Sequence, residues 1–203
     1  MIGLVGGDHS SPYGAIQAIS EKYKKDFGIL HIDAHADLRK AYEGFLWSHA
    51  SIMYNVMESS FAPKKLVQVG IRDFCEFEYD YSNSRKDIVT FFDLELANQV
   101  QSWVSWRALC DQIVSELPQN VYISFDIDGL DPSLCPNTGT PFPGGLSYAQ
   151  ALALLKSLEA QGKRIVGFDL CEVSPGESEM DWDGNVGARI LYKLCGWALL
   201  TNK

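Results

Sequence analysis

The sequence predicts an α/β fold in which three layers, α/β/α, surround a mostly parallel sheet. Short apolar runs alternate with helical patterns along the whole chain. Acidic and histidine-containing clusters follow several of these runs, at the strand ends where ligands gather in parallel α/β sheets. No repeat, low-complexity tract or linker divides the 203 residues, so we expect one domain over residues 1–203.

Six apolar runs have the length and composition of buried strands. They are rich in Val, Ile and Leu, and turn-forming or charged residues follow them. Because helical patterns lie between most of them, these strands should run parallel and be covered on both faces. The predicted strands cover residues 2–5, 29–33, 66–70, 88–92, 121–125 and 164–169.

One of the helices is marked by its own cap. Ser147 and Gln150 have the spacing of a capping box, and Gly162 suits the position after the last turn. Two segments are expected to be irregular: residues 73–86, and residues 131–145, whose four prolines and three glycines indicate a functional loop. The other predicted helices cover residues 12–25, 48–58, 100–116 and 185–200.

Composition argues against several classes of protein. The net charge of −9 argues against nucleic-acid binding and favours a small cationic substrate, although an acidic surface alone would carry the same charge. No stretch approaches the roughly 18 apolar residues of a membrane span, and the N-terminus lacks the pattern of a signal peptide. The five cysteines form no CxxC pair, which favours a reducing, cytoplasmic location.

The segment Asp33-Ala34-His35-Ala36-Asp37 has the pattern of a metal site. It follows an apolar run, and side chains two apart share a face in extended backbone, so Asp33, His35 and Asp37 should converge. A second acidic pair, Asp126 and Asp128, ends another apolar run. One ion would not balance so many carboxylates, so the sequence predicts two metal ions.

His9, in a polar turn after the first apolar run, extends the set of candidate ligands. The absence of sulfur suits Mn²⁺ better than structural zinc or copper, and two ions about 3.5–4 Å apart form the Lewis-acid pair of a hydrolase. Plainer interpretations exist, because Asp-x-Asp pairs are common in solvated loops and His9 would serve equally as a turn residue. His31 is expected to pack in the core. The candidate ligands are His9, Asp33, His35, Asp37, Asp126 and Asp128.

Four motifs follow one another between residue 3 and about residue 175. They are Gly6-Gly7-Asp8-His9-Ser10, Asp33-Ala34-His35-Ala36-Asp37, the stretch from Ser124 to Pro132, and Gly139-Thr140-Pro141 with Pro143-Gly144-Gly145-Leu146. In content and order they resemble the signature of the ureohydrolase family, which includes arginase, agmatinase and formimidoylglutamase. The resemblance implies an arginase-like fold, two Mn²⁺ ions, hydrolysis of a guanidinium group to urea and an amine, and a homo-oligomer, trimeric or hexameric.

The resemblance also implies a role for each ligand. One ion would bind His9 and Asp37, and the other would bind His35 and Asp128. Asp33 and Asp126 would bridge the two ions, and Asp37 would also relay a proton toward the leaving amine. Asp8 would steer a ligand without binding metal.

Two further residues match the family's catalytic positions. His49, in Ser48-His49-Ala50-Ser51, corresponds to the proton-shuttle histidine. Glu172 corresponds to the glutamate that pairs with the guanidinium, which suits a planar cation with several N–H donors. The plainer alternatives are that His49 caps the helix beginning near Ser48 and that Glu172 is a surface acid.

The residues after the first acidic cluster bear on the substrate. Asp37-Leu38-Arg39, followed by Tyr42-Glu43-Gly44 and Ser48-His49-Ala50, is most similar to agmatinases, which implies agmatine as substrate and putrescine as product, a step of polyamine biosynthesis. Arg39 would instead be able to grip a carboxylate, so arginase and formimidoylglutamase activities stay open. A hydrolase of other amidines or amides and a non-catalytic binding or assembly module are further alternatives.

One departure from the family concerns the start of the chain. Family members carry further strands before the first metal motif, whereas here that motif begins near residue 6. We therefore expect a fragment, a shortened homologue, or a chain whose remaining strands come from elsewhere. The strand at residues 2–5 would then be exposed at the sheet edge, and activity of this polypeptide alone is doubtful.

Overall fold

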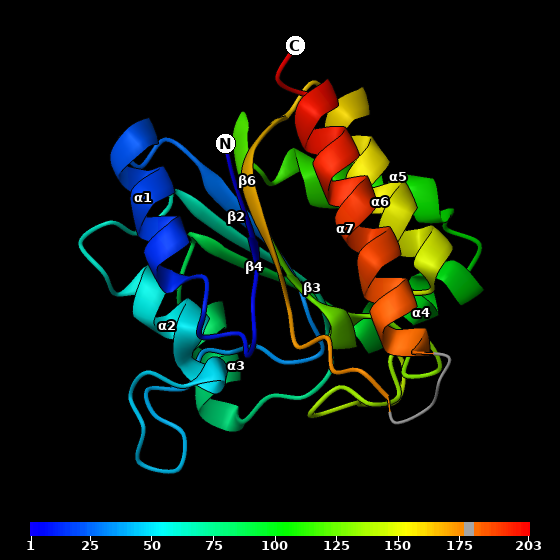
Figure 1. The fold of residues 1–203 in the computed structure, drawn as a ribbon, viewed down its shortest axis with the longest axis horizontal. Coiled ribbons are helices and arrows are strands. Elements are labelled where there is room, and N and C mark those ends of the chain that lie inside the picture. Colours follow the sequence, from blue (N-terminus) through cyan, green and yellow to red (C-terminus); the bar gives the residue numbers. More distant parts are fainter. Residues whose placement is uncertain (177–180) are drawn as a thin grey trace.

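The computed structural model, described over residues 1–176 and 181–203, contains a sheet of six strands in the order β1-β6-β5-β2-β3-β4 (Figure 1). Every neighbouring pair is parallel. The predicted α/β class and all six strands are confirmed, and the sheet is parallel throughout these pairs rather than only mostly so. The strands are β1 (Ile2–Val5), β2 (Gly28–Ile32), β3 (Lys65–Ile71), β4 (Ile88–Phe92), β5 (Asn120–Asp126) and β6 (Arg164–Cys171).

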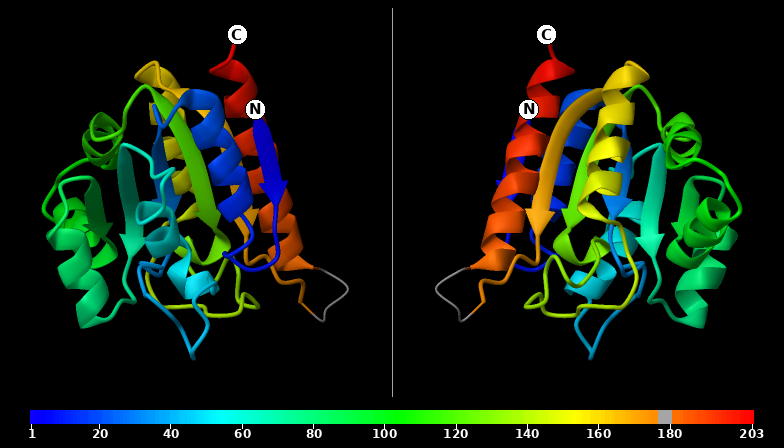
Figure 2. Two further views of the ribbon diagram at one scale, coloured as in Figure 1. Left: turned by 90° about the vertical axis from the view of Figure 1, so that its left-hand side faces the viewer. Right: turned by 90° about the vertical axis from the view of Figure 1, so that its right-hand side faces the viewer.

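Helices cover both faces of the sheet, so the predicted three layers are confirmed. On one face lie α1 (Tyr13–Tyr23), α2 (Ile52–Met57) and α3 (Glu76–Asn83) (Figure 1). On the other lie α4 (Asp93–Gln101), α5 (Trp106–Ser115), α6 (Tyr148–Ala160) and α7 (Trp182–Leu200), as the side views also show (Figure 2). Within the described residues, none of these helices is both long and apolar enough to cross a lipid bilayer.

Each face of the sheet has its own buried core, and β5 contributes to both. Val121, Ile123 and Phe125 pack with the layer of α5, α6 and α7, whereas Tyr122 packs with the layer of α1 and α2. Because side chains alternate along a strand, Ser124 and Asp126 share the face of Tyr122. The polar residues at the end of β5 therefore lie on the α1 side of the sheet.

The strand β1 forms one edge of the sheet, as the sequence analysis expected. Among the described residues it pairs with β6 alone. Its apolar side chains are poorly covered, and Val5 is 62% exposed. The opposite edge is β4, which α3 and α4 contact.

Two helix predictions are wrong. The single helix predicted over residues 100–116 is in fact the end of α4 and the whole of α5. The helical backbone is interrupted at Trp103, whose φ is +70°. A new helix begins after Ser105, whose hydroxyl accepts a hydrogen bond from the N–H of Ala108 at 3.2 Å. Residues 73–86, expected to be irregular, contain α3. Its buried Glu78 accepts bonds from the N–H of Cys75 at 2.8 Å and of Leu38 at 3.0 Å, so a distant loop helps to fix this helix.

Candidate metal centre

The six candidate ligands lie together at one edge of the sheet. All strands run parallel, so their carboxyl ends meet there: His9 follows β1, Asp33 follows β2, and Asp126 ends β5. Five of the six are at most 4% exposed, and only His35 is partly exposed. The convergence expected from strand-end positions is therefore present in the structure.

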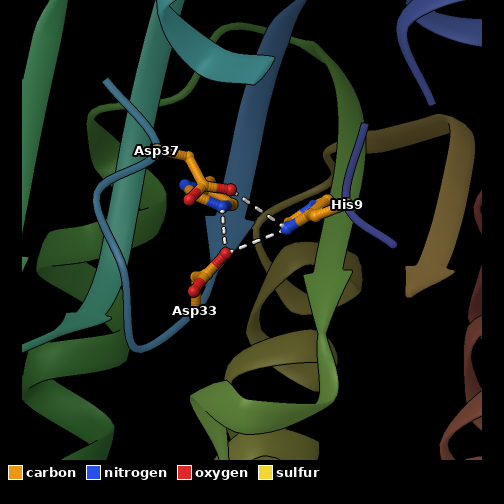
Figure 3. A group of neighbouring side chains, drawn as sticks. His9, Asp33 and Asp37 are labelled. Carbon is orange, nitrogen blue, oxygen red and sulfur yellow. Dashed lines mark hydrogen bonds and ion pairs between the residues drawn. The ribbon is translucent and has the colours of Figure 1, made fainter. Parts of the chain in front are cut away.

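His9 lies at the centre of a first group of ligand atoms. Its Nδ1 is 2.9 Å from Asp33 Oδ2, 3.2 Å from Asp126 Oδ2 and 3.4 Å from Asp37 Oδ2. Figure 3 shows the imidazole pointing between Asp33 and Asp37. The His9 nitrogen thus lies within 3.4 Å of a carboxylate oxygen from each of three aspartates, which two further segments of the chain carry.

His35 forms a second group beside the first. Its Nδ1 is 3.0 Å from Asp128 Oδ2 and 3.4 Å from Asp33 Oδ1. Asp33 therefore turns one carboxylate oxygen to each histidine. Asp126 does not do so, because its Oδ1 accepts the N–H of Asp128 at 2.9 Å and only Oδ2 lies near His9. Asp33 thus contacts both histidines, whereas no contact to His35 is found for Asp126 in the described part of the chain.

The spacing and chemistry of these groups fit divalent cations. In an octahedral shell with metal–ligand bonds of about 2.1 Å, neighbouring ligand atoms lie about 3.0 Å apart. The spacings between each Nδ1 and its carboxylate oxygens, 2.9–3.4 Å, are close to that value. Carboxylate oxygens with one imidazole in each group suit Mn²⁺ or a similar ion better than a thiophilic metal.

The carboxylates of the cluster are buried and repel one another, which raises the pKa of two of them. Burial and the charge of Asp33 raise the pKa of Asp37, and burial with the charges of Asp128 and Asp33 raises the pKa of Asp126. Burial alone would lower the pKa of His35, but hydrogen bonds to Asp128 and Asp33 outweigh it and raise the pKa to about 11. Without a cation His35 holds a proton at neutral pH, so a bound cation would displace that proton.

Unusual backbone conformations accompany the cluster. Asp37 has a φ of +55° and Glu172 a φ of +61°, a left-handed region that non-glycine residues seldom adopt and that is often found at functional sites. Gly129 follows the second acidic pair, and a Cβ on it would lie 2.7 Å from the backbone N of Asp33. Only glycine allows the loops after β5 and β2 to approach so closely.

His31 supports the cluster from beneath. It is fully buried, and the side-chain amide of Gln68 donates to its Nδ1 at 3.0 Å. The proton of the neutral ring therefore lies on Nε2, which donates to Asp33 Oδ2 at 2.7 Å. Burial lowers the pKa of His31, in keeping with a neutral ring. This is the packed histidine that the sequence analysis expected.

The other predicted site residues, Glu172, His49 and Asp8, lie in the segments that follow β6, β2 and β1, at the same edge of the sheet. Glu172 is half-buried, and its Oε1 accepts the backbone N–H of His9 at 2.9 Å. His49 begins the short 3₁₀ helix η1 (His49–Ser51), whose cap position is Ser48, and its ring contacts that of Tyr42. Asp8 is exposed and accepts the hydroxyl of Ser10 at 2.6 Å, so it shapes the turn that carries His9.

Sequence reasoning missed two residues at the same edge. Arg72 donates to the carbonyl oxygens of Asp128 at 2.7 Å and Leu130 at 3.2 Å, and so ties the start of the loop over residues 131–145 to β3. Asp73 Oδ2 lies 3.6 Å from His35 Nε2. Both residues come just after the strand predicted over residues 66–70. That position, at the carboxyl end of a parallel strand, was the feature of the sequence that could have identified them.

A cavity of about 90 Å³ adjoins the second group. Arg39 forms part of its wall, but its Nε lies 3.4 Å from the buried carboxylate of Glu78 and its guanidinium lies over the ring of Tyr42. The charge of Arg39 is therefore paired, whereas Asp73 adds a partly exposed carboxylate to the wall. The lining residues are His35, Asp37, Arg39, Tyr42, His49, Ala50, Asp73, Glu78 and Thr140.

The chain is similar to known proteins over nearly its whole length. Residues 1–196 match the model of the arginase family. The chain is 41% identical over 171 residues to N(1)-aminopropylagmatine ureohydrolase of Thermus thermophilus, covering 84% of this chain and 54% of that protein. It is 36% identical to the agmatinase of Chromobacterium violaceum, covering 98% of this chain and 57% of that one. The solved arginase of Medicago truncatula has a TM-score of 0.80 at 31% identity, with 98% of this chain and 59% of that chain covered. The chain spans about half the length of the curated relatives it matches.

Proposed function

The chain belongs to the arginase family, and on that premise we propose that it carries the catalytic core of a hydrolase that cleaves a guanidino compound to urea and an amine with two Mn²⁺ ions. The position of Asp33 is the observation that supports this most strongly. Its two carboxylate oxygens face the Nδ1 atoms of two different histidines, at 2.9 Å for His9 and 3.4 Å for His35. A carboxylate shared in this way is what two adjacent cations require.

The residues divide into two sets in this proposal. His9, Asp37 and Asp126 would hold one ion, His35 and Asp128 would hold the other, and Asp33 would serve both. Asp126 would have to turn its Oδ1 away from the N–H of Asp128 to bridge as well. When bound, the two ions supply Lewis acidity and make water nucleophilic at neutral pH.

Glu172 and His49 would act on the substrate itself. A carboxylate accepts bonds at both oxygens, so Glu172 can hold the backbone of His9 and still accept an N–H of the guanidinium. His49 lines the cavity with Asp37, which suits exchange of a proton between the leaving amine and solvent. These two residues orient the substrate and move protons, whereas the ligands position the ions.

Agmatine is the substrate that we propose. The similarity to an agmatinase favours it. The cavity favours it as well, because Glu78 already pairs with Arg39, and Asp73 offers a carboxylate to a terminal ammonium group. A substrate with a terminal carboxylate would instead meet this negative charge.

A substrate panel tests the proposal. The protein supplied with Mn²⁺ should release urea from agmatine, more slowly from arginine, and should not release formamide from formimidoylglutamate. Asp126→Asn should abolish the activity by removing a ligand, whereas Asp111→Asn, on the exposed surface of α5, should leave it unchanged. Binding of two ions without turnover of any compound would favour the non-catalytic module instead. Full activity of Asp126→Asn would refute its role as a ligand.

A further inference from the structure

The two candidate metal-binding histidines share an arrangement. Each turns its Nδ1 toward the carboxylate cluster, and each turns its Nε2 toward a further aspartate outside that cluster. A histidine that binds metal through one nitrogen commonly donates the proton of the other to a carboxylate, which fixes the tautomer and makes the ring a stronger ligand. The two outer aspartates are Asp169 and Asp73.

For His9 the connection to Asp169 runs through Ser124. The Nε2 of His9 lies 2.8 Å from the Ser124 hydroxyl, and that hydroxyl donates to Asp169 Oδ1 at 3.1 Å. Because the hydroxyl proton is used toward Asp169, the oxygen of Ser124 accepts the N–H of His9. Nε2 of His9 thus keeps its proton, and Nδ1, which faces Asp33, Asp37 and Asp126, is the nitrogen available to bind a cation.

The sheet itself holds this connection in register. Ser124 on β5 pairs directly with Asp169 on β6, and the backbone N–H of Phe125 also donates to Asp169 Oδ1, at 3.2 Å. Asp169 is 0% exposed, and its Oδ2 has no hydrogen-bond partner among the described residues. The Nε2 of His9 lies 3.8 Å from Asp169 Oδ1.

For His35 the contact needs no intermediate residue, but it is longer than a hydrogen bond and more exposed. Its Nε2 lies 3.6 Å from Asp73 Oδ2, and the Asp73 side chain is 46% exposed. The N–H of Asp73 donates to the carbonyl of Ala34 at 2.9 Å, which holds the segment after β3 against that carrying His35. Water screens this pair far more than it screens the buried one.

We propose that Asp169, acting through Ser124, and Asp73 are positioning residues that set His9 and His35 to bind metal through Nδ1, each strengthening one of the two ions. This inference rests on the proposed function, because it needs the two ions. Since Asp169 is buried and Asp73 is partly exposed, the effect of Asp169 should be the larger. Loss of a supporting group of this kind typically weakens metal binding about 10–100-fold.

The chain has only four histidines, so each can be followed separately by NMR. Protein labelled with ¹⁵N in histidine is titrated with Zn²⁺, a diamagnetic probe ion, in a chelator-buffered series. In the wild type, His9 and His35 should both bind through Nδ1 and keep a proton on Nε2. The spectra report, for each histidine, which nitrogen binds the ion and how tightly. If Asp169 and Asp73 only stabilised the fold, replacing one of them would not weaken binding at one histidine alone.

Asp169→Asn keeps the shape and removes the charge. It should weaken Zn²⁺ binding at His9 by about 10–100-fold and leave His35 unchanged. Ser124→Ala should weaken the same ion and shift the Nε2 signal of His9. Asp73→Asn should weaken binding only at His35, by less than about tenfold because water screens that pair. Asp111→Asn, on the exposed surface of α5, serves as the control and should change neither.

The outcomes separate this inference from the proposed function. Equal losses at both histidines, unchanged affinities in Asp169→Asn, or binding through Nε2 in the wild type would overturn the inference while leaving a two-metal centre in place. A wild-type protein that binds no ion at either histidine would refute the metal centre, and the inference with it.

Discussion

Asp33 is the residue on which the proposed two-metal arrangement depends most. Asp33→Asn keeps the size of the side chain and an oxygen that can accept the N–H of His35, which Asp33 Oδ1 accepts at 2.6 Å. It removes the charge that lies between the Nδ1 atoms of His9 and His35. We therefore expect this variant to lose both ions, whereas Asp128→Asn, which changes a proposed ligand of the ion at His35 alone, should lose one.

The magnitude follows from the number of ions. An ion present at a hundred times its Kd stabilises the folded state by about 2.7 kcal/mol, so two ions contribute about 5.4 kcal/mol. A chain of this size changes its melting temperature by about 2–4 °C per kcal/mol. Saturating Mn²⁺ should thus raise the Tm of the wild type by about 10–20 °C and that of Asp128→Asn by about half as much.

Thermal unfolding with and without Mn²⁺, followed by circular dichroism, measures these shifts. Asp33→Asn should show almost none, and the control Asp111→Asn should show the full shift of the wild type. An Asp33→Asn variant that retains half or more of the shift would refute the shared role of this carboxylate. A wild-type Tm that is the same with and without Mn²⁺ would refute the metal centre as a whole.

Three further predictions follow from particular contacts. Gly129→Ala should lower the free energy of unfolding by about 1–3 kcal/mol and weaken both ions, because its Cβ would lie 2.7 Å from the backbone N of Asp33; chemical denaturation and Mn²⁺ titration measure this. The affinity for Mn²⁺ should rise between pH 6 and 8, by about tenfold per pH unit for each proton released. The reason is that His35, with a pKa of about 11, holds a proton that the ion must displace. Calorimetry in buffers of different ionisation enthalpy counts the protons released. Arg72→Met should lower the free energy of unfolding by about 2–3 kcal/mol and make the loop over residues 131–145 easier to cleave with protease, because it removes the donors to Asp128 and Leu130.

Each of these predictions has a contrary result. Gly7, beside His9, has nothing within 4 Å of an added Cβ, so Gly7→Ala is a matched control, and equal losses in the two alanine variants would contradict the close approach at Gly129. An affinity for Mn²⁺ that is constant from pH 6 to 8 would show that no proton is displaced. Unchanged stability and protease resistance in Arg72→Met would mean that other contacts hold the loop.

The strands could be predicted from the sequence because each is an apolar run followed by a turn-forming or charged residue. Residues 2–5 and 88–92 were placed with the bounds that β1 and β4 have. The helix α3 could not be predicted, since Glu78 fixes it through a bond to Leu38, forty positions away. Local patterns also gave no sign that Ser105 would start a new helix within residues 100–116.

In the candidate site, too, some residues could be predicted from the sequence and others could not. The six proposed ligands could be found because they end apolar runs, and in a parallel sheet such ends meet. Asp169 and Ser124 could not be paired, because their contact depends on the register between β5 and β6, which spacing along the chain does not reveal. Asp73 lay in a segment whose mixed charge concealed its position at the same edge.

The most direct test of a shared two-metal centre is the anomalous diffraction of Mn²⁺ in crystals of this chain. We expect two peaks, one within bonding distance of His9 Nδ1 and one within bonding distance of His35 Nδ1, with the carboxylate of Asp33 between them. A single peak, or peaks away from these two nitrogen atoms, would contradict this expectation.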